Sequence, residues 1–165
     1  MEDFKFKKAY GQNFLKDNNI IERIVRESNI QKNSLVVEIG PGSGVLTKEL
    51  SKYADHVLAY EIDTRLEEVL DNNLLDCNNV DIIFDDFLKR DIEEDIKDYC
   101  YENIYVVANI PYYITTPIIM KIINSGLKFD KLTIMIQKEV GERFTANVKT
   151  RDYGSVTVFL NITSI

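Results

Sequence analysis

A buried strand and a glycine-rich turn are predicted by Val36-Val37-Glu38-Ile39-Gly40-Pro41-Gly42-Ser43-Gly44. The helical pattern of residues 45–53 follows this turn directly. Glycine allows positive φ angles and a close approach of the backbone to a ligand, and a helix N-terminus presents unpaired N–H groups. The spacing G-x-G-x-G differs from the dinucleotide fingerprint G-x-G-x-x-G. The turn alone therefore leaves two interpretations open, a simple tight turn or a site for a nucleotide-type ligand.

On both sides of this turn, short β-branched runs alternate with amphipathic helical patterns. The runs are apolar on both faces, as strands covered by helices on both sides should be. The alternation predicts an α/β fold with a doubly wound, mostly parallel sheet and helices on both faces. Strands are expected at Leu35–Ile39, His56–Ile62, Val80–Phe84, Ile104–Ala108 and Lys131–Gln137, and helices at Asn18–Ser28, Val45–Tyr53, Arg65–Asn73, Ile92–Tyr99 and Pro117–Asn124.

Length and composition fit one globular domain over residues 1–165. Apolar residues make up 45% and charged residues 28% of the chain, and this length suffices to bury a core without disulfides or structural metals. Cys77 and Cys100 have no C-x-x-C partner and no nearby histidine, which argues against a metal site and favours a reducing compartment. No apolar run approaches the ~20 residues that span a bilayer, and the N-terminus lacks a hydrophobic signal region. We therefore expect a cytoplasmic protein that binds neither metal nor membrane.

The net charge of −7 argues against a general polyanion binder, but the charge is uneven along the chain. Residues 85–102 carry eight acids and three bases, a net of −5, whereas residues 128–151 carry six bases and three acids, a net of +3. Solvated surfaces explain such runs as well as binding faces do. Aromatic and basic residues interleave in Phe4-Lys5-Phe6-Lys7-Lys8, as in a single-strand RNA contact or a solubilising tail.

Acidic side chains follow the second and third predicted strands. Glu61 lies about 20 residues after the glycine turn, where an acid can accept hydrogen bonds from both ribose hydroxyls of an adenosine ligand. Glu61 has no comparable structural role, whereas Asp63 is expected to be a helix N-cap and Thr64-Arg65-Leu66-Glu67 fits a capping box. After the third strand, Asp86 of Asp85-Asp86 could bind an adenine amino group or belong to an acidic loop. Successive parallel strands would bring these groups to one edge of the sheet.

The fourth strand leads directly into Asn109-Ile110-Pro111-Tyr112. A side-chain amide, a stiff proline turn and an aromatic ring thus occur together at the predicted ligand edge. A polar turn with a packed tyrosine is the plain alternative. The glycine turn and Glu61, which would lie at the same edge, favour a functional motif instead.

Asn109-Ile110-Pro111-Tyr112 resembles the motif of S-adenosylmethionine-dependent methyltransferases that act on the exocyclic amine of adenine. Gly11-Gln12-Asn13-Phe14-Leu15 resembles the N-terminal signature of ribosomal RNA adenine dimethyltransferases. Gln137-Lys138-Glu139-Val140, followed by Arg143-Phe144 and Tyr153-Gly154, resembles a later signature of their small-subunit (KsgA-type) branch. The resemblance covers residues 7–160. It implies a Rossmann-like methyltransferase fold, a role in ribosome biogenesis, and small-subunit ribosomal RNA as the partner of a monomer.

The resemblance also implies a site for S-adenosylmethionine. Asn13 and Leu15 would close over this cofactor from the N-terminal segment, and Gly40, with Gly42 in the same turn, would line its methionine end. Glu61 would hold the ribose, Asp86 the cofactor adenine, and Asn109 would lie between the cofactor and the target base. Members of the family continue into further strands and a small helical domain, and they form a helix where 154–160 has strand propensity. We therefore expect a catalytic domain truncated before the last strands.

The methylation of an adenine amine needs accurate positioning, because the lone pair of this nitrogen is delocalised into the ring. We expect the side-chain oxygen of Asn109 and the carbonyl of Ile110 to accept the two N–H groups and direct the lone pair at the methyl group. Pro111 would fix the turn, and Tyr112 would stack on the extruded adenine. Lys138 and Arg143, from the basic segment, are expected to contact RNA.

Two other functions remain open. A sister branch, which dimethylates a large-subunit adenine and confers antibiotic resistance, shares the glycine turn and the four-residue motif, but its members tend to be basic. A non-catalytic ribosome-assembly or transcription factor with the same fold need not keep Glu61, Asp86 and Asn109 together. His56, the only histidine, is expected at the start of a strand, opposite the ligand edge, and therefore in a structural role.

Overall fold

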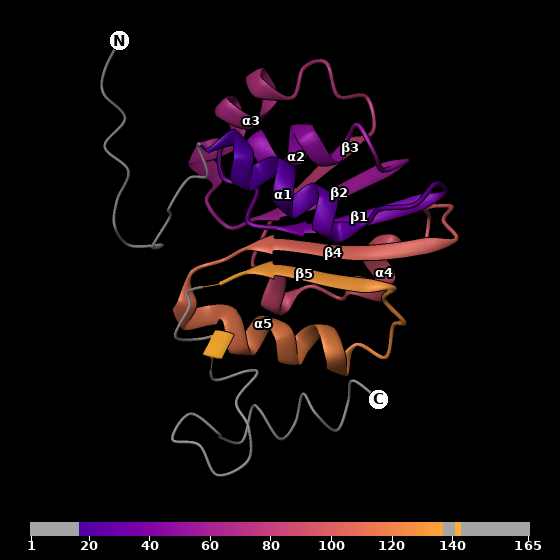
Figure 1. Cartoon of the computed structure of the whole chain (residues 1–165). Helices are drawn as coiled ribbons and strands as arrows, with labels where there is room; N and C mark the ends of the chain where they lie inside the picture. The colour runs from indigo at the N-terminus through magenta and orange to yellow at the C-terminus, as the bar shows by residue number, and fades with distance from the viewer. Residues whose placement is uncertain (1–16, 137–140, 143–165) are drawn as a thin grey trace.

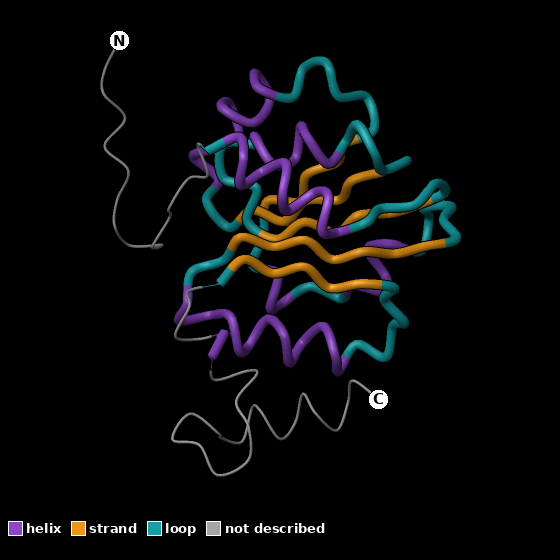
Figure 2. Tube along the Cα trace, in the orientation of Figure 1, coloured by secondary structure: helices purple, strands orange, loops and turns teal. Residues whose placement is uncertain are grey.

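A five-stranded sheet, parallel throughout, forms the centre of the molecule (Figures 1 and 2). The computed structural model describes residues 17–136 and 141–142. In chain order the elements are α1 (Asn18–Ser28), β1 (Ser34–Ile39), α2 (Val45–Leu50), β2 (His56–Glu61), the 3₁₀ turn η2 (Thr64–Leu66), α3 (Glu67–Asn73), β3 (Val80–Phe84), the 3₁₀ turn η3 (Phe87–Lys89), α4 (Ile92–Ile96), β4 (Asn103–Asn109), α5 (Tyr112–Asn124) and β5 (Lys131–Met135).

The strand order β3-β2-β1-β4-β5 makes the sheet doubly wound. The chain moves outward from β1 to β3, then returns to the other side of β1 with β4. The loops that follow β1 and β4 therefore leave the sheet in opposite directions, and open α/β sheets bind ligands at such a switch point, beyond the carboxyl ends of their strands. The predicted fold class is confirmed.

Alternation along the strands sends side chains to two separate cores. On one face, Val36, Val57 and Val107 pack with buried residues of α1 and α2. On the other face, Val37, Leu58, Val106 and their neighbours pack with buried residues of α4 and α5. Figure 1 shows α1, α2 and α3 on one side of the sheet and α4 and α5 on the other. Both faces are covered, which explains why β1 is buried at all six positions.

Three predicted helix boundaries differ from the structure by three residues or more. The helix expected to begin at Pro117 begins at Tyr112, five residues earlier, and Pro117 lies inside it. The Thr115 hydroxyl donates to the Pro111 carbonyl at 3.1 Å, which satisfies one acceptor of this first turn. The helices expected to end at Tyr53 and Tyr99 end at Leu50 and Ile96, and turns follow them.

The capping box expected at Thr64–Glu67 is absent from this part of the structure. Asp63 instead caps the chain one residue earlier, where its carboxylate accepts from the Arg65 amide at 3.2 Å, and α3 begins only at Glu67. The N-cap role predicted for Asp63 is thereby confirmed. Gly154–Leu160, Gln137 and the N-terminal segment lie outside the described residues. Among the described helices, none combines the length and apolar character that crossing a bilayer demands.

Candidate functional site

The strand register brings the predicted site residues to one edge of the sheet. Ile39, the last residue of β1, pairs with Tyr60 of β2 and with Ala108 of β4. The next residues along these three strands are Gly40, Glu61 and Asn109. Glu61 in turn pairs with Phe84 at the end of β3, which Asp85 and Asp86 follow. Four loops of the predicted site therefore begin at the same level.

The glycine turn adopts backbone angles that residues with a side chain rarely adopt. Gly40, Gly42 and Gly44 have φ angles of 75°, 59° and 79°. A Cβ atom on Gly40 would stand 3.6 Å from the carbonyl oxygen of Asn109. The turn after β1 and the motif after β4 therefore approach each other backbone to backbone, and a side chain at Gly40 would fill the space between them.

Glu61 holds this turn in place. Its residue is 2% exposed, and its two oxygens accept from the Gly42 amide at 3.0 Å and the Asp63 amide at 2.9 Å. Burial raises the pKa of the Glu61 carboxyl, and the backbone hydrogen bonds oppose that rise. The sequence predicted no structural role for Glu61, and this is wrong. Because each carboxylate oxygen can accept two hydrogen bonds, its capacity for a ligand is not exhausted.

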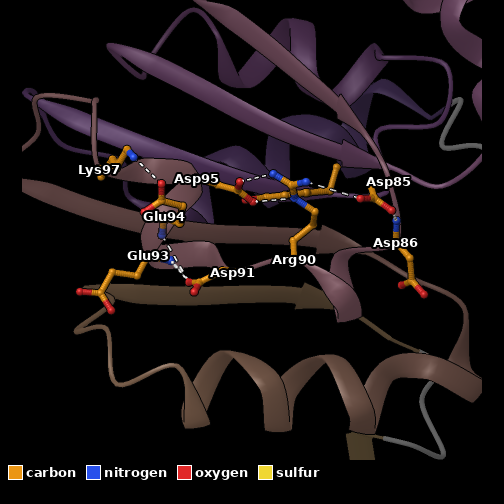
Figure 3. A network of polar contacts seen from close by, with 9 residues as sticks. Asp85, Asp86, Arg90, Asp91, Glu93, Glu94, Asp95 and Lys97 are labelled. Carbon is orange, nitrogen blue, oxygen red and sulfur yellow. Dashed lines mark hydrogen bonds and ion pairs between the residues drawn. The ribbon is translucent and has the colours of Figure 1, made fainter.

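Asp86 is the N-cap of the turn η3 and lies beside a small polar network. Its carboxylate accepts from the Leu88 amide at 3.0 Å and forms an ion pair with Lys89 at 3.6 Å. Asp85 accepts from the Asp86 amide at 2.7 Å and lies 3.5 Å from the Arg90 guanidinium. Figure 3 shows the Arg90 side chain between Asp85 and Asp95. The acidic loop expected as an alternative is therefore an ordered structure.

Two exposed apolar side chains lie at this edge and were not predicted as part of the site. Ile62 and Leu88 follow β2 and β3, directly after Glu61 and two residues after Asp86, and they are 48% and 36% exposed. A large apolar side chain beside a polar group that binds a base offers a surface on which a flat ring can stack. In the sequence, these two residues appear only as apolar residues close to Glu61 and Asp86. A residue buried in the core could occupy the same positions, so their exposure could not be predicted.

The motif after β4 is arranged for a different task. Asn109 is the last residue of β4 and pairs with Met135, Ile110 is buried, and Pro111 caps α5 with φ −59° and ψ 144°. Tyr112 begins α5, and its ring lies outside the described part of the structure. The loop is therefore held by β4 on one side and by α5 on the other, without an acidic side chain of its own.

Glu38 is a buried acid that the sequence analysis did not single out. It is 1% exposed in the middle of β1, and neither oxygen has a hydrogen-bond partner in the described structure. Burial raises the pKa of its carboxyl to about 8, and the charge of Glu61 adds to this rise. The signal was a single carboxylate within an apolar strand. A protonated Glu38 avoids a second buried charge beside Glu61.

Other predicted residues divide into those that the structure places and those that it does not. His56 begins β2, at the edge opposite the site, and its ring meets that of Tyr99 edge-on at 5.6 Å, in agreement with its predicted structural role. Asn13, Leu15, Lys138 and Arg143 lie outside the described residues, so their contacts stay predictions. Across residues 17–136 and 141–142, no group of three His, Cys, Asp or Glu side chains could hold a metal ion.

Comparisons with known proteins show which proteins this chain resembles. A family model described as ribosomal RNA adenine dimethylase matches residues 3–164. Ribosomal RNA small subunit methyltransferase A of Macrococcus caseolyticus is 48% identical over 94% of this chain and 53% of its own length. The chain spans about half the length of the curated relatives that it matches.

Solved structures show the same likeness. A dimethyladenosine transferase from Plasmodium falciparum has a TM-score of 0.78 at 30% identity, with 91% of this chain and 52% of that chain covered. The 23S rRNA methyltransferase ErmE has a TM-score of 0.67 at 32% identity, with 86% and 53% covered.

Proposed function

The chain belongs to the ribosomal RNA adenine dimethylase family, and we propose that it transfers methyl groups from S-adenosylmethionine to the N6 amine of adenines in small-subunit ribosomal RNA. One observation carries this proposal. Asn109-Ile110-Pro111-Tyr112 runs from the last residue of β4 to the first residue of α5, and the Asn109 carbonyl faces the side of Gly40 where a Cβ would stand 3.6 Å away. A motif typical of adenine methylation thus borders the turn that would hold the methyl donor.

The residues of this edge fit S-adenosylmethionine. Gly40 and Gly42 leave backbone without side chains beside Asn109, which suits a close approach of the methionine end. Glu61 keeps acceptor capacity for the two ribose hydroxyls. Asp86 would accept from the amino group of the adenine, whose faces Ile62 and Leu88 would cover. When bound, this cofactor supplies an electrophilic methyl group on a sulfonium.

The residues of the chain would act on the target base by orienting it. The Asn109 side-chain oxygen and the Ile110 carbonyl accept the two N–H groups of the adenine amine, so that its lone pair points toward the cofactor site. Pro111 fixes φ and keeps the two acceptors in register, and Tyr112 stacks on the extruded base. No general base is required, because a methylated amine loses its proton readily to water.

Ribosomal RNA would approach from the end of the chain that carries the basic segment 128–151. Of this segment, Lys131 begins β5 at the edge opposite the site, whereas Lys138 and Arg143 come after β5 in the sequence and are the bases expected to contact RNA. These cations would neutralise phosphates, which gives an affinity that falls with salt. We propose that the reaction takes place in the cytoplasm, where ribosomal subunits assemble, and that the chain acts as a monomer.

The large-subunit reaction is the second candidate, because the likeness to ErmE is real at 32% identity. The small-subunit target is preferred because the 48%-identical relatives carry that name over 94% of this chain. A non-catalytic role is the third. It is disfavoured by the joint presence of Glu61, Asp86 and Asn109 at one edge.

Nucleoside analysis of labelled ribosomal subunits tests the proposal. Unmodified small and large subunits are incubated separately with the chain and S-adenosylmethionine labelled in its methyl group. Dimethyladenosine in the small subunit alone is expected. Label in the large subunit would support the second candidate. Absence of label together with absence of cofactor binding would favour the non-catalytic role, whereas cofactor binding without label would place RNA recognition outside this chain.

A further inference from the structure

Arg90 connects two carboxylates from different parts of the chain (Figure 3). Its Nε atom donates to Asp95 Oδ2 at 3.0 Å, and its Nη2 atom donates to Asp95 Oδ1. On the other side, its Nη1 atom lies 3.5 Å from Asp85 Oδ2. The guanidinium therefore joins the loop after β3 to the helix α4. None of these residues was predicted to have a function.

Each of the two carboxylates also accepts a hydrogen bond from a residue next to the proposed cofactor site. Asp85 Oδ1 accepts from the Asp86 amide at 2.7 Å, directly beside the group expected to bind adenine. Asp95, whose side chain is 5% exposed, accepts from the Tyr60 hydroxyl at 3.0 Å. Tyr60 directly precedes Glu61, the expected ribose ligand.

Phe87 packs against the buried side of this network. Its ring is buried and packs edge-on against Tyr60 with 5.1 Å between the ring centroids. The residue after Asp86 is therefore anchored in the core, while the residue before it, Asp85, is fixed from outside by Arg90. Asp86 lies between these two anchors, which hold its backbone on both sides, and its carboxylate accepts from the Leu88 amide and pairs with Lys89.

We propose that Arg90 is a positioning residue for adenine recognition: by holding Asp85 and Asp95 together, it directs the Asp86 carboxylate at the amino group of the cofactor adenine. This inference rests on the proposed function. An arginine is required because its planar fork donates to Asp95 with two nitrogens and still reaches Asp85 with the third. The ammonium of a lysine is a single point and cannot make both contacts.

A purely structural role for Arg90 is the competing explanation, and ligand discrimination separates the two. The probes are S-adenosylhomocysteine and S-inosylhomocysteine, in which an oxygen replaces the adenine amino group, so that the exocyclic N–H donor is lost and N1 carries a proton instead. Their dissociation constants are measured by calorimetry with the full 165-residue chain. Because a hydrogen bond to a charged acceptor is lost, the unaltered chain should prefer the adenosyl ligand by about tenfold or more.

Two variants and one control test the role of Arg90. Arg90→Lys keeps the charge but not the fork, and Asp85→Asn keeps an Oδ1 acceptor for the Asp86 amide while it removes the contact with Arg90. Both should lose about tenfold in affinity for the adenosyl ligand and less than about twofold for the inosyl ligand. Lys97→Gln removes a cation that pairs only with Glu94 among the described ion pairs, and should leave the preference unchanged.

Each outcome decides a different question. Equal losses for both ligands, or an unchanged preference in both variants, would overturn the inference and leave the proposed function intact. Equal binding of both ligands by the unaltered chain would overturn the adenine role of Asp86 and the Arg90 inference with it. No binding of either ligand would overturn the cofactor proposal itself. A preference that disappears in Arg90→Lys and Asp85→Asn but persists in Lys97→Gln supports the inference.

Discussion

The carboxyl edge of the sheet is built differently on its two sides. After β2 and β3, the acids Glu61 and Asp86 already accept hydrogen bonds from backbone amides, and Arg90 joins the loop after β3 to α4. After β4, Asn109 leads through a proline into α5, where Tyr113 is half-exposed. The first side has its polar groups fixed before a ligand arrives, and the second is a short loop between two regular elements, β4 and α5. Binding and reaction should therefore be separable by mutation.

Asn109→Ala should break the reaction and spare binding. Without the side-chain acceptor, the adenine amine is no longer oriented, and we expect methyl transfer to fall by about 100-fold or more. The affinity for S-adenosylhomocysteine should change by less than about twofold, because Glu61 and Asp86 are untouched. Transfer is followed by nucleoside analysis and binding by calorimetry.

Asn124→Ala is the matched control for this substitution, because it makes the same chemical change at an exposed position at the other end of α5. It should retain both transfer and binding. If Asn109→Ala instead lost binding and transfer in equal measure, Asn109 would be a cofactor ligand and the division of the edge would be wrong.

Glu61→Gln should have the opposite effect. The amide nitrogen of glutamine would face one of the two backbone amides, a donor against a donor, and the negative charge would be lost. Charge-assisted hydrogen bonds contribute about 1.5–3 kcal/mol, so we expect cofactor affinity to fall by about tenfold or more. At saturating cofactor, kcat should fall far less than it does in Asn109→Ala.

The exposed Glu67, at the start of α3, provides the control for Glu61. Glu67→Gln removes the same charge a few residues away and should bind the cofactor normally. A Glu61→Gln protein with unchanged affinity would show that Glu61 holds the turn and does not contact the ribose.

Reversal of the basic charges should affect RNA alone. Lys138→Glu combined with Arg143→Glu should weaken binding to the ribosomal subunit several-fold and lower the slope of log K against log salt by about 1.4–1.8, or about 0.7–0.9 for each lost phosphate contact. Lys32→Glu combined with Lys97→Glu has the same charge change near the opposite edge of the sheet and should not alter the slope. An unchanged slope in the first variant would remove these two residues from the RNA interface.

The fold and the members of the site could be predicted because both depend on local patterns. Each strand was placed within two residues of its observed end, since β-branched runs bounded by turns mark buried parallel strands. Gly40, Glu61 and Asn109 could be grouped because the carboxyl ends of parallel strands share an edge. The early start of α5 was missed because proline is typical of the first turn of a helix, whereas Pro117 lies in the interior of this one.

The interactions between loops could not be predicted. Arg90 lies five residues before Asp95 and five after Asp85, and no periodic pattern shows that its guanidinium reaches both. The same holds for Glu61, whose structural role depends on the Gly42 amide 19 positions earlier. Such contacts depend on how the loops fold over the edge of the sheet, and this information is distributed over the whole chain.

Glu38→Gln should affect the reaction least, within about twofold near neutral pH, because a protonated carboxyl and an amide are both neutral there.

The main effect of Glu38→Gln should be on stability. The folded pKa of Glu38 is about 8 and its ordinary value is 4.5. Between these two pH values the folded chain keeps a proton on Glu38 that the unfolded chain has released. The free energy of unfolding therefore falls as pH rises from about 5 to 8, by at most about 1.4 kcal/mol per pH unit for this group. Above that range the contribution of Glu38 no longer changes with pH. Glu38→Gln lacks this titration. Urea unfolding of both proteins from pH 5 to 9 should therefore show that the free energy of unfolding of the variant rises relative to that of the unaltered chain up to about pH 8. Parallel stability curves would mean that the Glu38 carboxyl is ionised in the folded state over this pH range, beside the buried charge of Glu61.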